Sequence, residues 1–130
     1  MTATPIYAGL LAILFLVLSV RVVAVRGRVS LGDGGDAVVL RRMRGHANFT
    51  EYVPLILLMM AMLELSHFSI YFLHAAGIIL VVARLLHGYA LSFTEKFKFG
   101  RFWGTTLTFG LLIVCGTLCL YQGLRASALL

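Results

Sequence analysis

Charged side chains are scarce in this chain of 130 residues, of which only 12% are Asp, Glu, Lys or Arg. A soluble domain usually carries about a quarter of its residues as charged side chains. Hydrophobic residues instead make up 61% of the chain, and the mean hydropathy is +0.99. The scarcity of charge excludes an ordinary soluble domain and indicates that the lipid bilayer is the solvent.

Four apolar segments, at residues 6–25, 53–67, 70–86 and 102–120 with their flanks, can supply membrane spans. A helix needs roughly 20 apolar residues to cross a bilayer, and irregular backbone is not tolerated against lipid. The sequence therefore predicts an all-α integral membrane four-helix bundle, with one domain over residues 1–130 and no internal repeat. The expected helices cover residues 5–26, 37–65, 69–93 and 100–123.

The residues beside the first apolar segment and beside the two cysteines argue against a signal peptide and against cysteine chemistry. No basic residue precedes the first apolar segment, which is also longer than a signal core, so we expect a retained transmembrane helix. The two cysteines, Cys115 and Cys119, have no flanking histidine or carboxylate. We expect them to pack as small apolar residues, and no metal site is predicted.

Basic residues gather around the first and third connections between the segments, whereas the second connection has none. They are Arg21, Arg26, Arg28, Arg41, Arg42 and Arg44 around the first connection, and Lys96, Lys98 and Arg101 around the third. The positive-inside rule places both connections in the cytoplasm and both termini on the other side. The net charge of +6 then reflects topology, and no nucleic-acid partner is expected. We expect Arg41 and Arg42 to reach lipid phosphates.

Two prolines and one aspartate predict details of the helices. Pro5 suits the first turn of a helix, and Asp36 follows a Gly-rich turn and can cap the second helix. Pro54 lies inside the second helix, where it removes the donor to the carbonyl of Thr50 and favours a kink.

A dense polar cluster, RGHANFTEY at residues 44–52, directly precedes the apolar run of the second helix. Arg44, Asn48 and Glu51 stand at i, i+4 and i+7 and therefore share one helix face, with Tyr52 beside them. A guanidinium, an amide and a carboxylate together match a zwitterionic ligand that carries carboxylates and an ammonium group. The alternative is a polar ladder that only stabilises the helix.

Further polar residues lie at the same membrane depth on the third and fourth helices. The stretch ARLLHGYALS contains Arg84, His87 and Tyr89, and Arg101 begins the fourth helix. His87 could be a packed polar residue, and Arg101 could be an interface anchor beside an aromatic belt. As a functional group, Arg101 could hold a thiolate, because a nearby cation lowers the pKa of a thiol.

Ionisable residues are absent from the central turns of the first and last helices. A transporter normally places such a residue near the middle of the bilayer, so a small four-span transporter is disfavoured. Glu64, His67 and His74 lie towards the other end of the bundle, where we expect interfacial or packing roles.

The motif Arg44-x-x-x-Asn48-x-x-Glu51-Tyr52, followed by Pro54, resembles the signature of the MAPEG family, the membrane-associated proteins in eicosanoid and glutathione metabolism. The segments RVSLGDGG, ARLLHGYA and GRFWGTTLTF extend the similarity over nearly the whole chain, which looks most like the short bacterial members. The resemblance implies a homotrimer in the bacterial inner membrane. Glutathione would bind between neighbouring subunits near the cytoplasmic side.

The resemblance also assigns roles to individual residues. Arg101 would stabilise the glutathione thiolate. The residues that would hold glutathione are Arg26, Arg44, His46, Asn48, Glu51, Tyr52, His87 and Tyr89, with Arg21 or Arg28 as alternatives to Arg26. His87 looks like a histidine of the prostaglandin-E-forming branch, whereas Leu85 stands where the leukotriene-forming synthase has a tyrosine.

Two functions agree with this resemblance. The first is a membrane glutathione transferase or peroxidase that acts on hydrophobic electrophiles or lipid hydroperoxides, which arrive through the bilayer. The second is a non-catalytic lipid-binding protein of the same fold, as the lipoxygenase-activating member of the family is.

Overall fold

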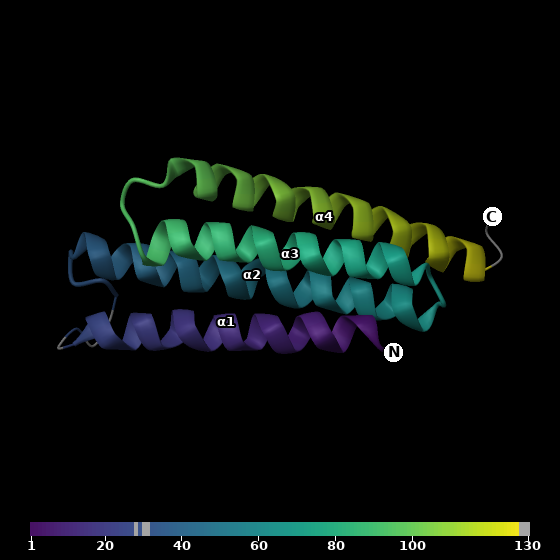
Figure 1. Cartoon of the computed structure of the whole chain (residues 1–130), viewed down its shortest axis with the longest axis horizontal. Coiled ribbons are helices and arrows are strands. Elements are labelled where there is room, and N and C mark those ends of the chain that lie inside the picture. The colour runs from purple at the N-terminus through teal and green to yellow at the C-terminus, as the bar shows by residue number, and fades with distance from the viewer. Residues whose placement is uncertain (28, 30–31, 128–130) are drawn as a thin grey trace.

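Four long helices form the whole of the regular structure in the computed structural model, which describes residues 1–27, 29 and 32–127 (Figure 1). The helices are α1 (Ala3–Arg26), α2 (Ala37–Leu65), α3 (Ile70–Ser92) and α4 (Lys98–Ala126). Each is long and apolar enough to cross a membrane. The predicted all-α four-helix bundle is confirmed, and α4 is longer at both ends than the sequence suggested.

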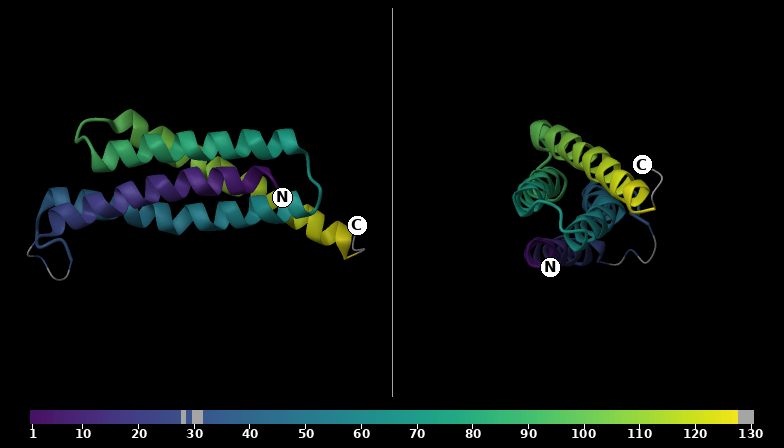
Figure 2. Two further views of the ribbon diagram at one scale, coloured as in Figure 1. Left: turned by 60° about the horizontal axis from the view of Figure 1, so that its bottom comes forward. Right: turned by 90° about the vertical axis from the view of Figure 1, so that its right-hand side faces the viewer.

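The α2–α3 pair forms the centre of the bundle, with α1 on one side and α4 on the other (Figure 1). Both outer helices contact α2 and α3, and within the described part of the chain no contact joins α1 to α4. The α3–α4 connection and the facing ends of α1 and α2 lie at one end of the bundle, here called the basic end. The first turn of α1 and the last turn of α4 lie at the opposite end (Figure 2).

The interior is filled by aliphatic side chains from all four helices. Fully buried examples are Leu11, Leu18, Ile56, Met60, Leu63, Leu73, Leu80 and Cys115. Cys115 and the half-buried Cys119 are free thiols that pack in this interior, as predicted. Many large apolar side chains of α1 and α4, such as Ile13 and Ile113, point outward. Such an exposed apolar surface is suited to lipid rather than to water.

Gly104 allows α4 to approach α3 closely near the basic end. A Cβ atom added at Gly104 would lie 2.7 Å from the carbonyl oxygen of Ala83 and 2.7 Å from Cβ of His87. Small residues of this kind let two membrane helices pack backbone to backbone. The contact sets the distance between the polar side chains of the two helices at this end.

The N-terminal ends of α2 and α1 are capped by carboxylate side chains, one from the adjacent residue and one from another helix. Asp36 accepts hydrogen bonds from the backbone N–H groups of Val38 at 2.7 Å and Val39 at 3.1 Å, which confirms the predicted cap of α2. At the opposite end, the Glu64 carboxylate accepts from the first N–H groups of α1, including those of Ala3 and Thr4, both at 2.8 Å. Glu64 thus supplies from α2 the cap that α1 lacks locally.

Three other residues that the sequence analysis discussed lie in the helices or between them. His74 on α3 hydrogen-bonds to the hydroxyl of Tyr7 on α1, with an Nδ1–O distance of 2.8 Å, so it has a packing role. His67 lies in the turn between α2 and α3 and is exposed. Helix α2 continues through Pro54 without interruption, and the kink expected there stays a prediction.

Gly104→Ala is expected to lower the free energy of unfolding by about 1–3 kcal/mol, because the added methyl group has to displace the α3 backbone. Thermal unfolding in detergent, followed by near-ultraviolet circular dichroism, measures this effect. Gly110→Ala is the control on the same helix, since nothing lies within 4 Å of its added Cβ. Equal behaviour of the two variants would contradict the close packing of α3 and α4.

Candidate functional site

A pocket of about 570 Å³ opens at the basic end between α2, α3 and α4. It is lined by Leu40, Arg41, Arg44, Ala47, Asn48, Glu51, His87, Leu91, Arg101 and Thr105. The α2 residues recur at helical spacing, so one face of α2 forms a continuous wall. Its volume lies within the range of small-molecule sites in proteins.

Residues from three helices that the sequence analysis selected come together in this pocket. They are Arg44, Asn48 and Glu51 from α2, His87 from α3 and Arg101 from α4. Arg44, Glu51 and Arg101 are exposed at the mouth, whereas His87 is only 5% exposed and lies deeper. The pocket therefore has charged groups at its opening and an imidazole in its interior.

Arg84 is buried directly behind the pocket, with only 2% of its surface exposed. Its guanidinium donates to the side-chain oxygen of Asn48 at 2.7 Å, to the hydroxyl of Thr108 at 2.5 Å and to the carbonyl of Gly104 at 3.2 Å. All three acceptors are neutral, and in the described residues no carboxylate lies within ion-pair distance of Arg84. A buried cation of this kind is costly in a membrane and is usually functional.

The bond to Arg84 determines what Asn48 can offer a ligand. Because its side-chain oxygen accepts from the guanidinium, its NH₂ group remains as the donor available to the pocket. Arg84 therefore orients Asn48 and adds positive potential beneath the pocket without lining it.

Arg101 lines the same pocket as His87, near the close approach of α3 and α4 at Gly104. In the described residues Arg101 makes no ion pair. Its guanidinium therefore has its charge available to a bound anion. Thr105, one turn further along α4, lines the pocket beside it.

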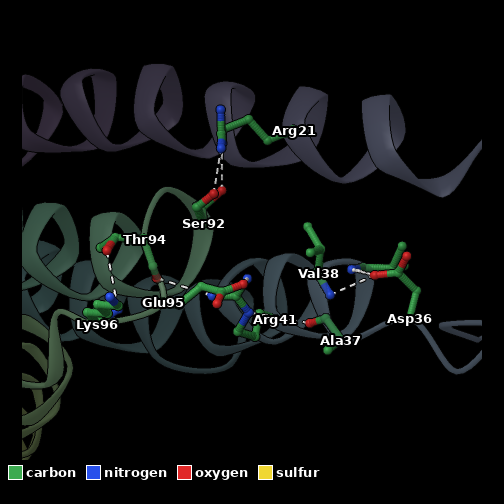
Figure 3. A network of polar contacts seen from close by, with 10 residues as sticks. Arg21, Asp36, Ala37, Val38, Arg41, Ser92, Thr94, Glu95 and Lys96 are labelled. Atoms are coloured by element: carbon green, nitrogen blue, oxygen red, sulfur yellow. Dashed lines mark hydrogen bonds and ion pairs between the residues drawn. The ribbon is translucent and has the colours of Figure 1, made fainter.

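Arg41 differs from the sequence-based expectation. It lines the pocket instead of extending away from the bundle, and its guanidinium pairs with the Glu95 carboxylate at 2.6 Å (Figure 3). A second bond, of 3.3 Å, runs to the carbonyl oxygen of Thr94. Both partners belong to the α3–α4 connection, so Arg41 ties α2 to the segment that leads into α4.

The other arginines near this connection have structural partners. Arg21 on α1 donates to the hydroxyl of Ser92 at 2.8 Å (Figure 3). The Arg21 guanidinium also lies over the ring of Phe93, 3.6 Å from its centroid. Arg42 donates to the carbonyl oxygen of Arg21 at 3.0 Å. Arg21, an alternative to Arg26 in the sequence analysis, is thus bound to the end of α3.

Four predicted binding residues do not line the pocket: Arg26, His46, Tyr52 and Tyr89. His46 faces α1, where its Nε2 lies 3.2 Å from the hydroxyl of Ser19. The Tyr52 ring packs against Phe109 on α4, and Tyr89 is 54% exposed. Arg26 ends α1, and Arg28, the other alternative, lies outside the described residues.

Several lining residues were not selected from the sequence. Leu40 and Ala47 continue the α2 face at spacings of four and three residues from Arg44, and Leu91 and Thr105 lie one turn beyond His87 and Arg101. Extending each selected residue by one helical turn would have found them. Within the described residues, no cluster of His, Cys, Asp and Glu could hold a metal ion.

A second hollow, of about 500 Å³, lies along α4 and adjoins the pocket. It is lined by Lys98, Arg101, Phe102, Thr105, Thr106 and Phe109. Arg101 and Thr105 line both spaces. The charged pocket and a groove with aromatic walls therefore meet at Arg101.

These features define a class, an integral membrane four-helix bundle with a cationic pocket at one end. The MAPEG family model matches residues 4–121, and the chain belongs to the MAPEG family. The chain is similar to inner membrane protein YecN of Escherichia coli (strain K12) and of Escherichia coli O6:H1. Identity to each is 36% over 88 residues, which cover 66% of this chain and 67% of the relative. No solved structure gives a significant match.

Arg84→Ala is expected to lower the free energy of unfolding by about 2–4 kcal/mol, because it leaves a cavity and removes the donor to Asn48. Arg84→Met fills much of the volume and should be less damaging. Arg125→Ala, at the exposed end of α4, should change stability by less than about 0.5 kcal/mol. Thermal unfolding in detergent ranks the three variants, and an Arg84→Ala variant as stable as Arg125→Ala would contradict the anchoring role.

Proposed function

We propose that this protein is a membrane-bound glutathione transferase with peroxidase-like capacity. The observation that carries the proposal is the meeting of a charged pocket and an aromatic-walled groove at Arg101. Glutathione, the thiol substrate, needs the charged pocket. A hydrophobic electrophile needs the aromatic-walled groove. Membership of the MAPEG family, which includes membrane glutathione transferases, supports the proposal.

The pocket offers a complementary group for each charged end of glutathione. The Glu51 carboxylate accepts hydrogen bonds from the ammonium group of the γ-glutamyl moiety, and the Arg44 guanidinium pairs with a carboxylate of glutathione. Asn48, oriented by Arg84, donates to a peptide or carboxylate oxygen. In this assignment the carboxylates of glutathione, which outnumber its ammonium group, offset the positive charge of a site in which arginines outnumber carboxylates.

Arg101 acts on the thiol. Its guanidinium favours the thiolate over the thiol and lowers the pKa of the bound thiol, by roughly 1–3 units at a partly dry interface. The proton is released to water at the open mouth of the pocket. His87 lines the same pocket as Arg101 and contacts the cysteinyl part of the ligand.

The hydrophobic substrate approaches the thiolate along the α4 groove from the lipid. In a transferase reaction, sulfur forms a bond to an electrophilic carbon, and the leaving group departs with its bonding electrons. In a peroxidase reaction, sulfur attacks the terminal oxygen of a hydroperoxide and breaks the O–O bond. The lipid alcohol leaves, and a second glutathione converts the sulfenic acid to glutathione disulfide and water.

We further propose a homotrimer in the bacterial inner membrane, with both termini outside the cytoplasm and the site on the cytoplasmic side. The basic residues around the first and third connections belong to the same end of the bundle, and this supports the orientation. Arg26, His46, Tyr52 and Tyr89 lie outside the pocket of their own subunit. Arg26 would reach glutathione bound to a neighbouring subunit.

A non-catalytic lipid-binding protein is the second candidate. The aromatic side chains of Phe102 and Phe109 in the α4 groove favour it, because they would bind an acyl chain whether or not a thiol is activated nearby. This candidate predicts lipid binding without turnover of any electrophile.

Arg101→Ala is expected to keep glutathione binding within a fewfold of wild type but to lose most thiolate formation. Difference absorbance in the thiolate band at neutral pH, together with calorimetry, separates these two effects in detergent-solubilised protein. Lys98→Ala is the control, since Lys98 lies one turn away in the groove but does not line the pocket. Full thiolate absorbance in Arg101→Ala would assign activation to another group.

Two inactive variants should complement each other if the site lies between subunits. Glu51→Ala removes a binding group from the pocket of its own subunit. Arg26→Ala removes a binding group from the site of the neighbouring subunit. Co-expressed, the two variants form mixed trimers in which some sites contain both native residues, so part of the glutathione binding returns. Separately purified and mixed variants without subunit exchange provide the control. No recovery in co-expressed trimers would indicate a site within one subunit.

A further inference from the structure

The Arg41–Glu95 pair withdraws one cation from the wall of the pocket. Arg41 lines the pocket, yet its guanidinium is turned to the α3–α4 connection by Glu95 at 2.6 Å and by the Thr94 carbonyl at 3.3 Å. Arg44 and Arg101 make no ion pair in the described residues. The pocket thus contains two guanidinium groups open to a ligand and one that a carboxylate of the same chain already occupies.

Glu95 lowers the capacity of the site for anionic groups. Three arginines and one glutamate line the pocket, and a second carboxylate at its rim removes one unit of positive charge. A ligand with an additional carboxylate would have to separate Arg41 from Glu95 or bind beside a like charge. Both cost binding free energy. Unfavourable contacts with the wrong ligand are a common source of specificity.

We propose that Glu95 is a specificity-determining residue, which restricts the pocket to thiol peptides with no more carboxylates than glutathione has. This inference rests on the proposed function and defines its substrate class. The side chains of Arg41 and Glu95 are 28% and 70% exposed. Such a surface pair contributes little to folding stability, so its effect on ligand charge can be measured without unfolding the protein.

The test compares glutathione with γ-glutamylcysteinylglutamate, which has the same thiol and one more carboxylate at the C-terminal residue. Calorimetry gives both Kd values for the wild type and for Glu95→Gln. The wild type should prefer glutathione. In Glu95→Gln, the ratio of the two Kd values should shift by about two- to sixfold towards the more anionic peptide, as expected for one charge at ~8 Å in a solvated site.

The ratio isolates charge from structural damage, because a distorted pocket would weaken both ligands together. The double variant Arg41→Gln/Glu95→Gln restores the wild-type net charge and should restore the wild-type ratio. The shift in Glu95→Gln should also shrink at high salt, since exposed charges are screened. Lys96→Gln changes the charge of the adjacent residue, whose backbone N–H donates to the Thr94 hydroxyl. This variant should not move the ratio towards the anionic peptide.

The outcomes distinguish this inference from the proposed function. Binding of glutathione by the wild type with an unchanged ratio in Glu95→Gln would overturn the role of Glu95 and leave the transferase proposal intact. No binding of either peptide by the wild type would overturn both. A ratio that shifts in Glu95→Gln but stays shifted in the double variant would show that Glu95 acts on the ligand directly, which contradicts the role assigned to Arg41.

Discussion

The candidate site at the basic end depends on one buried cation. Arg84 joins α3 to Asn48 of α2 and to Gly104 and Thr108 of α4, and all its partners are neutral. A bundle built for stability alone would place an aliphatic side chain there, because desolvating a guanidinium without a counter-ion is unfavourable. The arrangement keeps positive potential beneath the pocket, and an anionic ligand would supply the missing charge.

Close helix packing and the polar side chains of the candidate site occur together at the basic end of α3 and α4. Gly104 brings the backbones of α3 and α4 together, and Arg101 and His87 line the same pocket beside this contact. Beside the pocket, α4 also exposes the aromatic side chains of Phe102 and Phe109. The same helix therefore forms a wall of the charged pocket and a wall of the apolar groove, and Arg101 borders both.

The sequence predicted most of the fold and the composition of one pocket wall. Apolar length determines the four helices, and the helical period determines that Arg44, Asn48 and Glu51 share a face. Contacts between helices could not be predicted in the same way, because they depend on how each helix is rotated about its axis. The pairing of Arg41 with Glu95 and the position of Arg84 behind Asn48 are of this kind, and the partners are far apart in the chain.

The cap that Glu64 provides to α1 has a consequence for biogenesis. In the part of the chain that the structure describes, the side-chain acceptor of the first N–H groups of α1 is Glu64, near the end of α2. Unpaired N–H groups are unfavourable in a hydrocarbon environment, so α1 is completed only when α2 has crossed the bilayer. The two helices are therefore expected to insert together as a hairpin, in which α2 completes the hydrogen bonding of α1.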